Sequence, residues 1–176
     1  MQENTGGGWR RPGGPSGQLR EISWLRGGGG REVEGLNIPY AKELKKLVQR
    51  LLARLGEDTT IILYGSMARG DYGEWSDVDL VVISNRLRGN PLERTEELVR
   101  LNRGLYMPLE LAAYTEEGFL RALSPTALDA LHEGVVLHAS PAFLARARRE
   151  LARLMEELGL VKEGRSWVAT KRPAAR

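Results

Sequence analysis

Apolar residues recur along the chain with two different periods, which predict alternating helices and strands. In two long segments the apolar positions are spaced by three and four residues, as in an amphipathic helix. The first segment begins at Pro39, which suits a first helical turn, and ends at Gly56; the second runs from Ser140 to Gly159. Short apolar runs predict strands at 59–64, 78–84, 108–114 and 134–138.

Shorter helices are expected between the predicted strands. One covers 66–70, directly after the first strand, and another covers 91–102. Two more are expected after Thr115 and after Ser124, residues of the type that caps helices. A short closing strand is expected at 167–169. The alternation predicts an α+β or α/β domain built on a small mixed sheet of four or five strands packed with helices.

The two ends of the chain differ in composition from the middle. Residues 1–35 contain 11 glycines and show no apolar period, so we expect them to be disordered. The folded domain is expected over 36–160, including the last long helix, and is followed by a basic tail at 161–176. Residues 140–176 carry nine basic and four acidic side chains. Such a charge suits an acidic partner or a nucleic acid, or a solvated helix face and tail.

Composition excludes several classes of site and protein. The chain has no cysteine, which excludes disulfides, thiolate metal sites and a cysteine nucleophile. No apolar run approaches the roughly 20 residues that a membrane helix needs. The first residues also lack the continuous apolar segment of a secretory signal. We therefore expect a cytoplasmic protein that does not associate with membranes.

The pair Gly65-Ser66, which follows a predicted strand and opens a predicted helix, is the first candidate for chemistry. Glycine lets the backbone approach a ligand closely, and the N–H groups at a helix start favour an anion. Arg69 lies one turn further along the same helix, so its guanidinium can reach the same anion. These residues predict a phosphate-binding turn; the alternative is a plain turn with a capping serine.

Three carboxylates form the second candidate. Residues i and i+2 of a strand point to one face, about 6.6 Å apart along it, so Asp77 and Asp79 project together. Adjacent ionised acids repel each other unless a cation lies between them. Glu110 interrupts a later apolar strand and can point to the same face if the two strands are neighbours. Three such carboxylates suit two divalent ions, whereas the alternative is three acids that only face solvent.

Together these residues resemble the nucleotidyltransferase superfamily typified by DNA polymerase β, and more narrowly its minimal nucleotidyltransferase (MNT) group. The pattern of that group is Gly-Ser, ten residues, then Asp-x-Asp. Gly65-Ser66 and Asp77-Val78-Asp79 match it without insertion, and the resemblance covers about residues 40–140. The third acid of the family is most often Asp, whereas this chain has Glu110.

The resemblance implies a polymerase β-like fold and a specific reaction. A nucleoside monophosphate, by default AMP from ATP, would be transferred to a hydroxyl group with release of pyrophosphate. Two Mg²⁺ ions would be held by the three catalytic acids Asp77, Asp79 and Glu110. The triphosphate would be bound by Gly65, Ser66 and Arg69.

The resemblance also implies a partner. Members of the MNT group are commonly antitoxins paired with a HEPN-domain ribonuclease toxin, and some transfer AMP to a tyrosine of that toxin. This is the leading expectation, with nucleic acid a less favoured partner. Two alternatives stay open. One is transfer to a small hydroxylated molecule, although the 37 residues after 139 barely supply the usual extra helical domain. The other is an antitoxin that neutralises its partner by binding alone.

Overall fold

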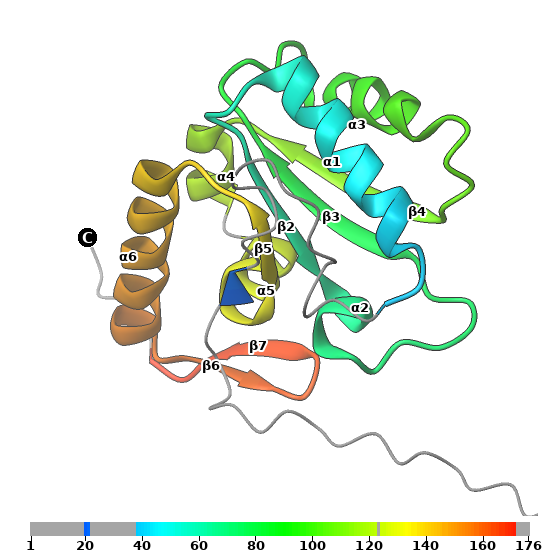
Figure 1. Cartoon of the computed structure of the whole chain (residues 1–176). Helices are drawn as coiled ribbons and strands as arrows, with labels where there is room; N and C mark the ends of the chain where they lie inside the picture. The colour runs from blue at the N-terminus through cyan, green and yellow to red at the C-terminus, as the bar shows by residue number, and fades with distance from the viewer. Residues whose placement is uncertain (1–19, 22–37, 123, 172–176) are drawn as a thin grey trace, which may run out of the picture.

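A five-stranded mixed sheet forms the centre of the protein, for which a computed structural model describes residues 20–21, 38–122 and 124–171 (Figure 1). The strand order is β1-β5-β2-β3-β4. Strand β2 pairs antiparallel with β3 and β5, whereas β3–β4 and β1–β5 are parallel pairs. The strands are β1 (Arg20–Glu21), β2 (Thr60–Tyr64), β3 (Val78–Ile83), β4 (Leu109–Tyr114) and β5 (Val135–His138). The predicted mixed sheet is thus confirmed.

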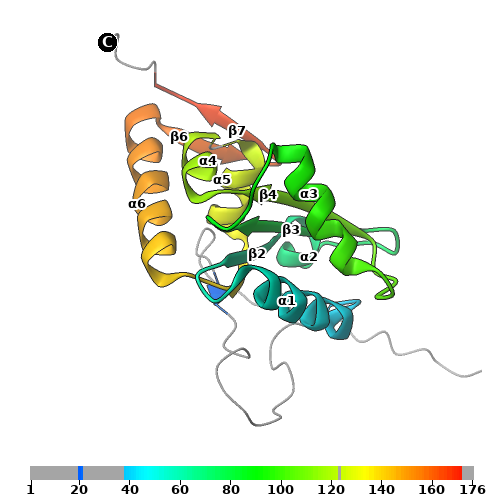
Figure 2. The same ribbon diagram turned by 90° about the horizontal axis from the view of Figure 1, so that it is seen from above.

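Helices pack on both faces of the sheet, and Figure 2 shows these two helical layers from above, with the sheet between them. Alternate residues of β2 divide between two buried clusters, because successive strand side chains point to opposite faces. On one face lie α1 (Ala41–Leu55), α3 (Pro91–Val99) and the 3₁₀ turn Arg100–Asn102. On the other lie α4 (Glu116–Ala122), α5 (Pro125–Glu133) and α6 (Pro141–Leu158). The short α2 (Gly65–Arg69) follows β2 directly.

The predicted helix boundaries are confirmed to within a few residues. Helix α1 begins two residues after Pro39, because Tyr40 is in the left-handed region with φ 63°. Ser124 caps α5, with its hydroxyl accepting a hydrogen bond from the N–H of Ala127 at 3.3 Å. Asn90 and Glu93 form a capping box at the start of α3. Local capping chemistry therefore positions the helices where the apolar pattern predicts them.

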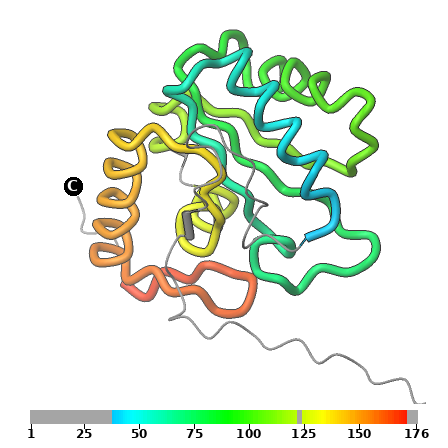
Figure 3. Tube along the Cα trace, viewed as in Figure 1, coloured from blue at the N-terminus to red at the C-terminus, as the bar shows by residue number. Residues whose placement is uncertain are grey.

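The last part of the described chain differs from the prediction. After α6 it forms an antiparallel hairpin of β6 (Leu160–Glu163) and β7 (Ser166–Ala169), which is separate from the main sheet. The strand predicted at 167–169 therefore exists, but it pairs with β6 and does not close the sheet. Figure 3 shows this hairpin beside α5. Trp167 makes the contact, since its indole N–H donates to Asp129 Oδ1 at 2.7 Å.

The predicted disordered segment 1–35 lies outside the described residues, apart from the two residues of β1. Of the helices in the described ranges, none has the length and apolar character that crossing a membrane requires. The division of the chain at residues 35 and 160 stays a prediction.

Candidate functional site

The turn between β2 and α2 brings the backbone close to a carboxylate. Gly65 has φ 70°, a conformation that favours glycine. A Cβ atom built on it would lie 2.0 Å from Asp79 Oδ2, so the glycine hydrogen is all that fits there. Ser66 follows at the start of α2, which has no side-chain cap, so the predicted alternative of a capping serine is not observed. The pair thus places the first turn of α2 against Asp79.

The carboxylates of two neighbouring strands meet at this turn. In the parallel pair β3–β4, Asp79 is the direct cross-strand partner of Glu110, so the two side chains share a face of the sheet. The two strands are neighbours, which is the condition for Glu110 to share that face with Asp79. Asp77 lies one residue before β3. Asp79 is half-buried, whereas Asp77 and Glu110 are exposed.

The electrostatics show that these charges act on one another. Burial, together with the negative charges of Glu110 and Asp77, raises the pKa of Asp79 from 3.8 to about 6, while Arg69 opposes the shift. Burial also raises the pKa of Tyr64 above its ordinary range, and Asp79 and Glu110 add to the effect. The end of the sheet is therefore a region of negative potential, relieved in part by one guanidinium.

The chemistry of the donors fits a hard divalent cation such as Mg²⁺, which prefers carboxylate oxygens. The crowded Gly65–Asp79 contact and the facing position of Glu110 also bring the donors to one end of the sheet. Within the described part of the chain, however, no three His, Asp or Glu side chains lie close enough together to hold an ion as they stand. Like charges separate when no cation lies between them. The roles of Asp77, Asp79 and Glu110 as metal ligands stay a prediction.

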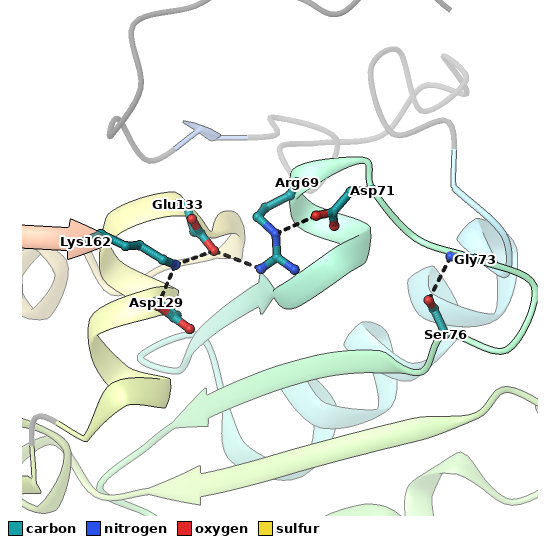
Figure 4. Close-up of polar contacts among 7 residues, drawn as sticks. All are labelled: Arg69, Asp71, Gly73, Ser76, Asp129, Glu133 and Lys162. Carbon is teal, nitrogen blue, oxygen red and sulfur yellow. Dashed lines mark hydrogen bonds and ion pairs between the residues drawn. The ribbon is translucent and has the colours of Figure 1, made fainter. Parts of the chain in front are cut away.

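Arg69 is held by two carboxylates (Figure 4). Its Nε donates to Asp71 Oδ2 at 3.2 Å, and its Nη1 donates to Glu133 Oε1 at 2.9 Å. Lys162 of β6 contacts the same Glu133 oxygen at 2.7 Å. Sequence reasoning missed these partners, because Glu133 and Lys162 belong to no motif and only the tertiary fold brings them to α2.

The loop between α2 and β3 presents an aromatic side chain beside the site. The hydroxyl of Ser76 accepts a hydrogen bond from the N–H of Gly73 at 2.9 Å, which closes the loop on itself (Figure 4). Trp75 is 89% exposed, whereas Tyr72 is half-buried and packs against the core. The loop before β4 presents Tyr106, which is 93% exposed. Two aromatic rings therefore face solvent on the loops that lead into β3 and β4.

Comparison with solved structures gives fold-level likenesses. A candidate nucleotidyltransferase from Sulfolobus solfataricus is 22% identical, with a TM-score of 0.41 over 54% of this chain and 76% of that chain. A mutant MntA-HpeT toxin-antitoxin structure is 20% identical, with a TM-score of 0.47 over 66% and 92%. A toxin-antitoxin structure with AMP-PNP is 20% identical, with a TM-score of 0.44 over 64% and 90%.

No curated protein matched the chain. By contrast, residues 43–127 match the family model described as a nucleotidyltransferase domain. The matched residues include the Gly65 turn, α2, β3 and β4, and therefore all the residues that the motif singles out. The mixed sheet and the facing acids Asp79 and Glu110 lie in that segment as well. Residues 43–127 of this chain are thus similar to a nucleotidyltransferase domain.

Proposed function

We propose that the chain transfers a nucleoside monophosphate, AMP from ATP, to a hydroxyl group in the presence of Mg²⁺. One observation carries the proposal: Asp79 lies both against Gly65 and opposite Glu110. This supports the proposal, because Gly65, Asp79 and Glu110, which are separate in the sequence, lie together at one end of the sheet. In the reaction the acceptor oxygen attacks the α-phosphorus, and the bond to pyrophosphate breaks.

Each of the predicted site residues has a proposed role in this reaction. The start of α2 at Gly65-Ser66 and the guanidinium of Arg69 bind the triphosphate. Asp77, Asp79 and Glu110 hold the metal, and the exposed Glu110 accepts the proton of the acceptor hydroxyl. When bound, Mg²⁺ neutralises charge on the phosphates and lowers the pKa of that hydroxyl. The residues contribute mainly by positioning and by charge stabilisation.

The proposed acceptor is a tyrosine of a HEPN-type toxin, with this chain acting as the antitoxin. The Gly-Ser-x₁₀-Asp-x-Asp spacing supports this assignment through the resemblance to the MNT group. The exposure of Asp77 and Glu110 leaves the acids accessible to a large acceptor. Trp75 and Tyr106 add exposed aromatic surface on the adjoining loops, the residue type enriched where proteins meet.

The test is incubation of the chain with labelled ATP, Mg²⁺ and the product of the neighbouring gene, the proposed toxin. We expect label on a toxin tyrosine and loss of toxin activity. The control is Asp77→Asn, which is expected to transfer no label. Neutralisation without label, equal in the control, would instead show an antitoxin that acts by binding. Label on a small hydroxylated molecule alone would contradict the toxin assignment.

A further inference from the structure

A chain of ion pairs joins the C-terminal hairpin to the helix that carries Arg69 (Figure 4). Lys162 of β6 lies between two acids of α5, with its Nζ 2.7 Å from Asp129 Oδ1 and 2.7 Å from Glu133 Oε1. The same Asp129 oxygen accepts the indole N–H of Trp167 at 2.7 Å. Glu133 in turn accepts from Arg69. Both strands of the hairpin are thus connected to α5, and β6 is connected through Glu133 to α2.

The middle of this network is sheltered from solvent. The side chain of Lys162 is 12% exposed, that of Glu133 18% and that of Asp129 22%. Charges in such positions are screened less than surface pairs, and removing one partner leaves the others uncompensated. Asp129 and Glu133 are one helical turn apart on α5 and would repel each other without a cation. Lys162 therefore offsets this repulsion and, together with Arg69, holds Glu133 in place.

Glu133 and Asp71 together fix the plane of the Arg69 guanidinium. Two of its five N–H groups are engaged, one on Nε and one on Nη1. Burial alone would lower the pKa of Arg69, but these hydrogen bonds raise it above its ordinary value, so the group stays charged. Its charge acts on Asp79, which lies against Gly65. The guanidinium is thus held beside the turn where the triphosphate is proposed to bind.

We propose that Lys162 is a positioning residue for nucleotide binding, which orients Arg69 toward the triphosphate through Glu133. The inference rests on the proposed function and extends it to the hairpin, which lies beyond the matched residues 43–127. A lysine that binds no substrate atom thereby sets the affinity for the nucleotide. The hairpin therefore contributes to nucleotide binding through Lys162.

The test is the dissociation constant for ATP with Mg²⁺, measured by calorimetry on the full chain. We expect Lys162→Met to raise it about tenfold, the equivalent of ~1.4 kcal/mol, and Lys162→Arg to restore most of the affinity. Lys171→Met is the matched control, because Lys171 lies just after the hairpin and its Nζ donates to the carbonyl of Glu156. That control is expected to leave the affinity unchanged.

A second variant and a double substitution separate positioning from general damage. Glu133→Gln keeps the shape of the side chain and is expected to weaken ATP binding to a similar degree. In an Arg69→Ala background, Lys162→Met is expected to cause no further loss, since the two act as one unit. Equal ATP affinity in Lys162→Met and the unsubstituted chain, or tighter binding in Glu133→Gln, would overturn the inference alone. An unsubstituted chain that binds no ATP would overturn the proposed function as well.

Discussion

Asp79 and Glu110 face each other across the parallel pair β3–β4, although α3 and its flanking loops separate them in the sequence. Parallel neighbours need a crossover connection, and here α3 supplies it. The register of the pair places the longer acid opposite the shorter one. The facing pair is therefore a property of the topology and does not depend on either side chain alone.

The two aspartates of the motif are expected to be required for transfer but not for folding. Asp77→Asn and Asp79→Asn each remove one negative charge without changing the volume of the side chain. We expect transfer of label from ATP to fall by a factor of about 100 or more, the scale of a lost electrostatic contribution to catalysis. Circular dichroism is expected to be unchanged. Normal turnover in either variant would refute the assignment of the site.

The stability of the protein without metal is expected to depend on Asp79. Folding raises the pKa of this acid from 3.8 to about 6, so the folded state binds the proton more tightly than the unfolded state. The free energy of unfolding should therefore fall as the pH rises through that window. Asp79→Asn removes the fall and is expected to gain about 1–2 kcal/mol at pH 7, after allowance for solvent screening.

Thermal unfolding in EDTA at two pH values checks this. The difference in Tm between Asp79→Asn and the unsubstituted chain should be larger at neutral pH than at about pH 4. Adding Mg²⁺ is expected to raise the Tm of the unsubstituted chain and to raise that of the variant less, since a ligand stabilises the state that binds it. A Tm difference that does not change with pH would contradict the proposed cause.

Much of the fold follows from the sequence, and the reasons are local. The stripe of α1 and the runs of β2, β3 and β4 show in the apolar pattern, while Gly56 and Ser124 mark helix ends. Gly65-Ser66 and the pair Asp77 and Asp79 could be singled out because they form a motif of fixed spacing, whereas Glu110 depended on which strands are neighbours. The partnership of Arg69 with Glu133 and Lys162 could not be predicted, because it depends on how α5 and the hairpin pack.

Strand β6 is another feature that could not be predicted from the sequence. Its sequence LVKE carries two apolar residues, and only alternate positions are half-buried. A pattern this short does not separate a strand from a tail. What makes it a strand is its pairing with β7 and the anchoring of Lys162 to α5, and both are contacts between residues distant from any motif.

Replacing Gly65 is expected to cost both stability and activity. In Gly65→Ala the new Cβ would meet Asp79 Oδ2 and would also be held at φ 70°. Gly70→Ala is the matched control, since Gly70 has φ 81° and open space around its Cα. The backbone cost alone is about 1–2 kcal/mol in each variant.

Chemical denaturation and an ATP-binding measurement distinguish the two glycine variants. We expect Gly70→Ala to show only the backbone cost, and Gly65→Ala to lose more stability and to bind ATP poorly. Equal losses of stability and equal ATP affinities in the two variants would mean that the close approach of Gly65 to Asp79 does not contribute to ATP binding.

Trp75 is expected to matter for the acceptor and not for the fold. Because its side chain is 89% exposed, Trp75→Ala should change the free energy of unfolding by no more than about 0.5 kcal/mol. Tyr72→Ala, in the same loop but packed against the core, should destabilise the protein more. Binding of the proposed toxin partner to immobilised Trp75→Ala is expected to weaken while ATP affinity stays the same. Unchanged toxin binding would remove this loop from the proposed interface.

The tight approach of Gly65 to Asp79 has a consequence for anyone redesigning this enzyme. The residues at positions 65 and 79 constrain each other, because the space between them does not admit even one methyl group. The longer acid stands at position 110, where the surface is open, and the shorter acid stands where the turn crowds it. Exchanging the two acids would therefore place the extra methylene at the crowded position. A library that varies these positions one at a time would miss the combinations that still fit.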